Sequence, residues 1–254
     1  MGTRTVLLLI FLMLAAEVFA CTKCHKPHYV EVGTCAACHR GEMRSSRENV
    51  AHVGLLTAEY SSFYTDKKAV AAGERIVTDS ACRRCHNIGA EGGSAAADLN
   101  SSVMKYAGEY LDDKIKNVNQ YMPDFHFTDT ERRLVILYLL NAASGQPKKV
   151  SEPYVAYITP SKKGAFEKHC GGCHRMITRK GGGKGTGSEA ANLSGLLTKY
   201  FVSSVLPANE KQWTEKRLKE WIKNPRSINK LALMPPVRIS DEETNQVISD
   251  ISGK

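Results

Sequence analysis

The chain has few aromatic residues and no cysteine outside one repeated motif. Aromatic side chains make up 7% of its 254 residues and hydrophobic residues 42%, so a large core built from side chains alone is not expected. Beyond the N-terminus, no apolar run approaches the ~20 residues that span a bilayer. The run 134–140 is expected to form one buried face of a helix. Basic stretches at 162–163 and 179–180 lack interleaved aromatics, which favours exposed faces or protein-docking patches over nucleic-acid sites.

All eight cysteines belong to four copies of the motif Cys-x-x-Cys-His. The pairs are Cys21 and Cys24, Cys35 and Cys38, Cys82 and Cys85, and Cys170 and Cys173. This spacing is typical of haem c attachment, where both thiols join porphyrin vinyl groups and the histidine becomes the proximal iron ligand. A single copy could be a zinc half-site, and exported cysteines often form disulfides, but four complete copies favour haem. The sequence therefore predicts four covalently attached haem c groups, with proximal ligands His25, His39, His86 and His174.

Residues 1–20 have the features of a secretory signal peptide. Arg4 supplies positive charge, residues 6–16 are apolar, and Val18-Phe19-Ala20 places small residues where a signal peptidase recognises them. An uncleaved anchor is the alternative, but the apolar segment is shorter than a membrane span. A lipoprotein is disfavoured because Phe19 is bulky and lipid on Cys21 would remove a haem attachment. We therefore expect cleavage and export to the periplasm, where haem c is attached.

Two segments that follow the third and fourth motifs repeat one pattern. Each has a Met-Pro dipeptide, then Thr or Ser with Glu three residues later, then apolar residues at helical spacing. The dipeptides begin at Met122 and Met234, and the capping pairs are Thr128 with Glu131 and Ser240 with Glu243. A stretch at 144–160 that contains Pro and Lys is predicted to be the linker between the two segments.

The glycine-rich stretch 179–188 has some likeness to a phosphate-binding loop. Lys184, however, is followed by Gly185 rather than Ser or Thr, and no strand is predicted before it. We expect a flexible loop near the fourth haem instead.

With these features the chain resembles class I cytochrome c twice, over residues 63–143 and 161–254. That family has a helix before CxxCH, a distal methionine in a Met-Pro loop, and a C-terminal helix packed on the first. The second copy also has an Asn-Leu-Ser-Gly turn at 192–195 and a helix ending at Asn224-Pro225, which look like the family's middle segment. The first helix is less strictly repeated, because Gly73 and Gly164 stand at different distances from their cysteines.

The resemblance implies a mainly α fold, in which two small all-α domains follow a haem-dense N-terminal segment. It also implies that Met122 and Met234 are the sixth ligands of the third and fourth haems, where a soft thioether suits low-spin iron. His126, four residues after Met122, is the competitor at the third haem. His169 directly precedes Cys170 and is expected to be exposed.

Residues 21–60 resemble instead the small multihaem cytochromes with bis-histidine ligation, where closely spaced CxxCH motifs alternate with isolated histidines. His28 and His52 are the isolated histidines here. The resemblance implies that His28 ligates the second haem and His52 the first. The reverse pairing stays open, as does a His52 that only packs on its surroundings. A segment this short suits a dihaem module held together mainly by haem and iron–histidine bonds.

Four irons with two protein ligands each would leave no open site for a substrate, so we expect an electron carrier and not an enzyme. Methionine raises the reduction potential relative to a second imidazole, so electrons would pass from the first two haems to the last two. Haem propionates would offset much of the formal charge of +9.

The expected partners are redox proteins. The donor would be a quinol-oxidising membrane complex or a small periplasmic cytochrome, and the acceptor a terminal reductase, an oxidase or another cytochrome. Peripheral membrane association is compatible with this role, and nucleic acid is not expected as a partner. One alternative is a cytochrome subunit of a membrane redox complex. Another is a haem peroxidase or reductase in which one iron, most plausibly the third, stays open.

Overall fold

The computed structural model describes residues 25–27, 35–144, 146 and 164–253. The predicted signal peptide, Cys21, Cys24, His28 and most of the predicted linker lie outside these residues, as does the side chain of Cys38. The chain divides into two compact units, residues 1–64 and 65–254. The described residues are mainly helical, as predicted. None of the helices among them is both long and apolar enough to cross a membrane.

The described part of the first unit consists of short helical turns around a small apolar centre. Its buried hydrophobic side chains in the described part are Leu56, Tyr60 and Phe63. The elements are α2 (Cys35–His39), α3 (Glu48–Ala51), α4 (Ala58–Ser61) and the 3₁₀ turn η2 (Ser62–Tyr64).

Within the second unit, residues 65–144 form a group of helices around the pair α5 and α8. The N-cap of α5 is Asp66, whose side chain accepts a hydrogen bond from the Ala69 backbone. The predicted capping box at the start of α8 is present, since Thr128 and Glu131 each accept from the other's backbone N–H. The elements are α5 (Lys67–Asp79), the 3₁₀ turn η3 (Cys82–Arg84), β1 (Asn87–Ile88), β2 (Glu91–Gly92), α6 (Leu99–Lys105), α7 (Gly108–Lys116) and α8 (Asp129–Ser144).

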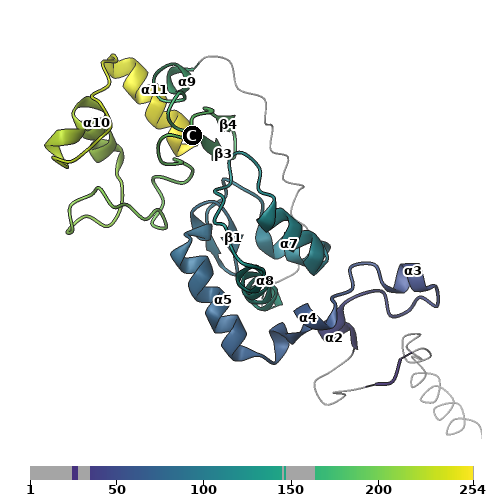
Figure 1. The fold of residues 1–254 in the computed structure, drawn as a ribbon. Coiled ribbons are helices and arrows are strands. Elements are labelled where there is room, and N and C mark those ends of the chain that lie inside the picture. The colour runs from purple at the N-terminus through teal and green to yellow at the C-terminus, as the bar shows by residue number, and fades with distance from the viewer. Residues whose placement is uncertain (1–24, 28–34, 145, 147–163, 254) are drawn as a thin grey trace, which may run out of the picture. The chain divides into compact units, whose positions relative to one another are not determined.

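Helix α8 is buried on all sides over residues 135–140, and the expectation of a single buried face was wrong. The reason is that α5, α6 and α7 all pack against it; Figure 1 shows α8 along its axis with α5 and α7 beside it. A close crossing is at Gly73 of α5, where a Cβ atom would lie 2.0 Å from the Leu134 carbonyl oxygen. Only a residue without a side chain fits there.

Residues 164–253 of the same unit form a second group of helices, in which α9 and α11 lie side by side (Figure 1). The predicted capping box of Ser240 and Glu243 opens α11, and Gly253 in the left-handed region closes it. Helix α10 ends at Asn224-Pro225, also as predicted. Helix α9 has 5 residues where α5 has 13, so the first helix is not strictly repeated. The elements are α9 (Ala165–His169), β3 (Met176–Thr178), β4 (Gly182–Lys184), α10 (Glu215–Lys223), the 3₁₀ turn η4 (Pro225–Ser227) and α11 (Asp241–Ser252).

Part of the stretch expected to be a flexible loop belongs to a hairpin whose strand β4 is buried. Strands β3 and β4 pair antiparallel, with Met176 opposite Lys184 and Thr178 opposite Gly182. The Lys184 ammonium lies 3.1 Å from Asp250 Oδ1, and both side chains are almost fully buried. A strand therefore does precede the glycine-rich turn, against the prediction. The lysine is committed to an internal ion pair, which agrees with the rejection of a phosphate-binding loop.

Candidate functional site

The third CxxCH motif follows α5 directly, and its turn begins at Ala81, a non-glycine residue with φ 53°. His86 Nδ1 lies 2.7 Å from the Ala97 carbonyl oxygen. Because a carbonyl can only accept, this contact makes Nδ1 the donor and leaves the Nε2 lone pair free for a metal. Burial lowers the pKa of His86, which keeps the ring in the neutral form that ligates.

A cleft next to this motif has His86 and Met122 in its wall. Its enclosed volume is about 220 Å³. Its other walls include both motif cysteines, Tyr121, Pro123 and Phe125. His126 does not line it, and its side chain is 86% exposed. The structure thus brings Met122, and not the competing His126, to the cleft of the third motif.

The fourth motif has the same arrangement within residues 164–253. His174 Nδ1 lies 2.7 Å from the Ala191 carbonyl oxygen, which again frees Nε2. His174, Cys170 and Met234 share one cleft. The Trp221 indole N–H donates to the Met234 sulfur at 3.0 Å, which orients the thioether. The remaining walls are apolar and are formed by Leu193, Leu196, Trp213, Leu218, Trp221, Ile222, Val247 and Ile251.

The first unit brings two of the predicted ligands together. The rings of His25 and His52 have centroids 6.1 Å apart and planes tilted by 49°. A metal–imidazole bond is about 2 Å long, so two imidazoles on opposite sides of one metal have centroids roughly 6 Å apart. The separation therefore fits a metal held between these two rings. In the second motif, His39 Nδ1 lies 3.3 Å from the Leu56 carbonyl oxygen, which repeats the arrangement of the later motifs.

The motif cysteines in the described residues are thiols without disulfide partners: Cys35, Cys82, Cys85, Cys170 and Cys173. Burial is the main cause that raises the pKa of Cys82 to about 11, and it does the same for Cys170, with Glu167 and Asp250 adding to it. No three His, Cys, Asp or Glu side chains of the described ranges gather into a metal-binding group. Neutral thiols beside an apolar cleft and a free imidazole Nε2 fit covalent haem attachment better.

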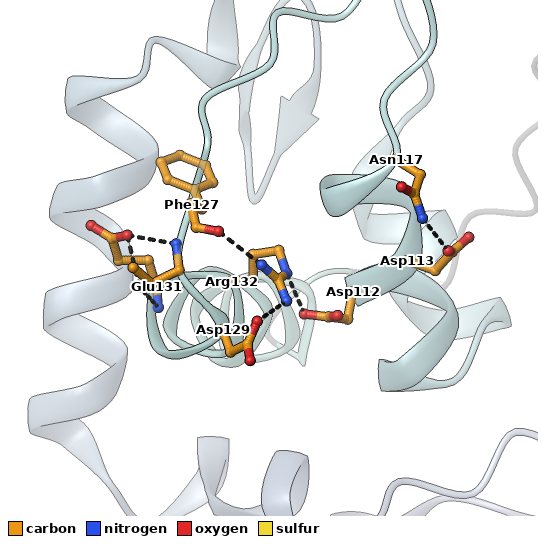
Figure 2. Close-up of polar contacts among 8 residues, drawn as sticks. Asp112, Asp113, Asn117, Phe127, Asp129, Glu131 and Arg132 are labelled. Carbon is orange, nitrogen blue, oxygen red and sulfur yellow. Dashed lines mark hydrogen bonds and ion pairs between the residues drawn. The ribbon is translucent and has the colours of Figure 1, made fainter.

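Arg132 fixes the segment between Met122 and α8 (Figure 2). Its guanidinium donates to Asp112 Oδ1 of α7 and to the Phe127 carbonyl oxygen, each at 2.8 Å, and also to Asp129. The hydrogen bonds to Asp112 and Asp129 raise the pKa of Arg132 and keep it charged. One side chain thus joins the end of the methionine-bearing segment to two helices, a role the sequence did not reveal because an arginine in an amphipathic pattern looks like a surface residue.

His169 is 17% exposed rather than free in solvent, so the expectation of an exposed ring was wrong. Its Nε2 lies 3.0 Å from Glu243 Oε1, and Lys168 binds the same oxygen at 2.8 Å. These contacts join α9 to α11. The hydrogen bonds from Lys168 and His169 lower the pKa of Glu243 to about 2. His169 is therefore a structural partner of the capping glutamate, not an iron ligand.

A family model described as cytochrome c oxidase, cbb3-type, subunit III, matches residues 68–139. Those residues run from α5 into α8 and contain the third CxxCH motif and Met122. Searches of curated proteins and of solved structures found no match. The match and the site agree: residues 68–139 are similar to a c-type cytochrome domain, and the residues of the cleft fit the covalently bound haem c of such domains.

Proposed function

We propose that the protein is a tetrahaem c-type cytochrome that carries electrons in the periplasm, and that it is not an enzyme. A bis-histidine dihaem module at 21–60 precedes two class I cytochrome c-like domains at 63–143 and 161–254. The donor is a quinol-oxidising complex or another low-potential protein, and the acceptor has a higher potential. The cleaved signal peptide at 1–20 directs the chain to the compartment where haem c is attached.

The observation that carries this proposal is the pairing of ligands in each cleft. His86 shares a cleft with Met122, and His174 shares one with Met234. When bound, haem iron supplies one-electron chemistry by alternating between its ferric and ferrous states. The cysteines would anchor the group, the histidines would offer Nε2 to the iron, and the methionine sulfurs would be the second ligands from the protein. With two protein ligands on each iron, a substrate would have no open position on the metal.

The 6.1 Å spacing of the His25 and His52 rings supports the bis-histidine assignment at the first haem. In the same bis-histidine arrangement, the ligands of the second haem are His39 and His28. Two imidazoles stabilise ferric iron more than an imidazole and a thioether do, so the first two haems have the lower potentials. Electrons then pass from the N-terminal module toward the two methionine-ligated domains.

The family match supports a second candidate from the same class. The matching family is named for a subunit of a cbb3-type cytochrome c oxidase, so this chain could serve as the cytochrome subunit of a membrane redox complex. Purification from solubilised membranes distinguishes the two. A free carrier is recovered in the periplasmic fraction alone, whereas a subunit co-purifies with a membrane-embedded partner.

Carbon monoxide binding tests the carrier against an enzyme with an open iron. The probe is carbon monoxide added to the dithionite-reduced holoprotein at neutral pH, followed by absorption spectroscopy. The proposal predicts almost no binding. Met122→Ala is the positive control, because removing the thioether opens the third iron and one haem should then bind the gas. If the unaltered protein binds carbon monoxide at about one molecule per haem or per protein, the carrier proposal is refuted and a peroxidase or reductase is favoured.

A further inference from the structure

The loop that carries Met122 is hydrogen bonded from both sides. Within its own domain, Asn119 Oδ1 accepts from the backbone N–H of Tyr121 at 2.9 Å and of Met122 at 3.2 Å. From the other domain, the Asn192 side-chain amide donates to the Tyr121 carbonyl oxygen at 2.7 Å. The carbonyl that precedes the methionine is thus held by a residue 71 positions further along the chain. The second domain contacts the main chain directly next to the proposed ligand.

The side chain of Tyr121 is held by the same domain. It is 3% exposed, and its ring lies against Gly183 of strand β4. A Cβ atom at Gly183 would lie 2.1 Å from Tyr121 Cζ, and its three nearest neighbours would all be Tyr121 atoms. The bare backbone of the hairpin is therefore the surface on which this ring packs, and any side chain at that position would displace it.

Further contacts place the same domain against the third motif. Ile177 of β3 lines the cleft that also contains His86 and Met122. Gly195, at φ 66°, approaches so closely that a Cβ atom there would be 2.2 Å from the Arg84 carbonyl oxygen. The Arg84 guanidinium carbon lies 5.3 Å from the centre of the Phe201 ring. Residues of the second domain thus contact both the turn of the third CxxCH motif and the methionine loop of the first domain.

We propose that the 164–253 domain completes the third haem site by holding Tyr121, and through it Met122, in the ligating position. Asn192 and Gly183 are positioning residues: they touch neither the metal nor the cofactor, but act through Tyr121. The inference rests on the proposed ligation by Met122. Its consequence is that the two C-terminal haem domains act as one dihaem unit, in which contacts made by the fourth haem's domain set the ligation and potential of the third.

Two variants of different kinds test this inference. Asn192→Asp keeps the side-chain oxygen that accepts from Ser194 N at 2.9 Å, but replaces the donor to Tyr121 with an oxygen that repels the carbonyl. Asn229→Asp is the matched control, because Asn229 Oδ1 likewise accepts from the N–H two residues later, at 2.9 Å, while its amide faces a carbonyl of its own domain.

Gly183→Ala inserts a methyl group against the Tyr121 ring. Gly164→Ala is its control, since a Cβ atom there has its nearest neighbour at 3.4 Å, an ordinary contact. Far-ultraviolet circular dichroism and haem content by mass spectrometry establish that each variant is folded and loaded.

The readouts are the near-infrared charge-transfer band of methionine-ligated ferric haem, a redox titration, and carbon monoxide binding. Met122→His and Met234→His assign the band and the potential of each haem in advance. We expect Asn192→Asp and Gly183→Ala to weaken the third haem's band, lower its potential and admit carbon monoxide there. The fourth haem should keep its signals, and both controls should match the unaltered protein at the third haem.

Unchanged third-haem signals in both Asn192→Asp and Gly183→Ala would overturn the inference, as would equal losses in the Asn229→Asp control. Failure of the underlying proposal looks different. If the Met122→His variant has the same spectrum as the unaltered protein, Met122 is not the ligand. The proposed ligation is then refuted before any positioning variant is compared.

Discussion

Replacing Gly73 by alanine should destabilise the first cytochrome domain, although helix propensity alone predicts the opposite. Alanine is favoured over glycine inside a helix by about 0.5–1 kcal/mol. At Gly73, however, the new Cβ would lie 2.0 Å from the Leu134 carbonyl oxygen and 2.7 Å from its carbon. These are backbone atoms, so no side-chain rotation relieves the clash, and α5 and α8 must move apart.

The size of the effect follows from these two terms. Overpacking a close contact costs typically about 1–3 kcal/mol, and this clash with rigid backbone belongs at the upper end. Subtracting the propensity gain leaves a loss of about 2 kcal/mol. Such a loss corresponds to roughly 30-fold faster hydrogen exchange in amides that exchange by opening of the domain.

Hydrogen–deuterium exchange with mass spectrometry reads this out locally, in peptides from α5 and α8 of the holoprotein. Peptides from α9 and α11 serve as internal references and should not change. Ala71→Gly, at an exposed position of the same helix, is the control for propensity and should cost about 1 kcal/mol. A Gly73→Ala variant as stable as the parent, or more stable, would show that the close crossing of α5 and α8 is wrong.

Three further predictions address charge, loop anchoring and ligation. Glu243→Gln should lower stability at pH 7, but not near pH 2. The Glu243 pKa is lowered from 4.5 to about 2, so the charged carboxylate stabilises the fold above about pH 4.5, and this stabilisation is lost as the pH falls to 2. Urea titrations of the variant and the unaltered protein across this range test whether their free energies of unfolding become equal at low pH. Arg132→Met should loosen the segment after Met122 and lower the urea concentration at which half of the methionine charge-transfer band is lost. Arg217→Met removes a more exposed ion pair and should leave that concentration unchanged. His52→Ala should open one low-potential haem to carbon monoxide. If no carbon monoxide binds, His52 packs on its surroundings and is not an iron ligand.

Features that depend on neighbouring residues could be predicted from the sequence. Both capping boxes and the helix end at Asn224-Pro225 are present, because a side-chain cap or a proline acts within three or four residues of itself. The gathering of each predicted methionine with its motif histidine in one cleft came from the family resemblance, since the two residues are far apart in the chain.

Features that depend on tertiary contacts could not be predicted. The carbonyls of Ala97 and Ala191 that orient the motif histidines leave no signal, because every residue has a carbonyl. Strand β4, Gly182–Lys184, lacks the apolar alternation of a strand and forms only by pairing with β3. The bond from Asn192 to Tyr121 likewise follows no local rule, although it lies beside a proposed iron ligand.

Low-temperature electron paramagnetic resonance of the purified holoprotein, recorded through a redox titration, tests the central claim most directly. The account predicts four low-spin ferric haem signals of two kinds: two bis-histidine and two histidine–methionine. The histidine–methionine pair should be reduced first, at the higher potentials. Four signals of one kind, or a methionine-ligated pair that titrates below the bis-histidine pair, would contradict the proposed ligands and the direction of electron flow.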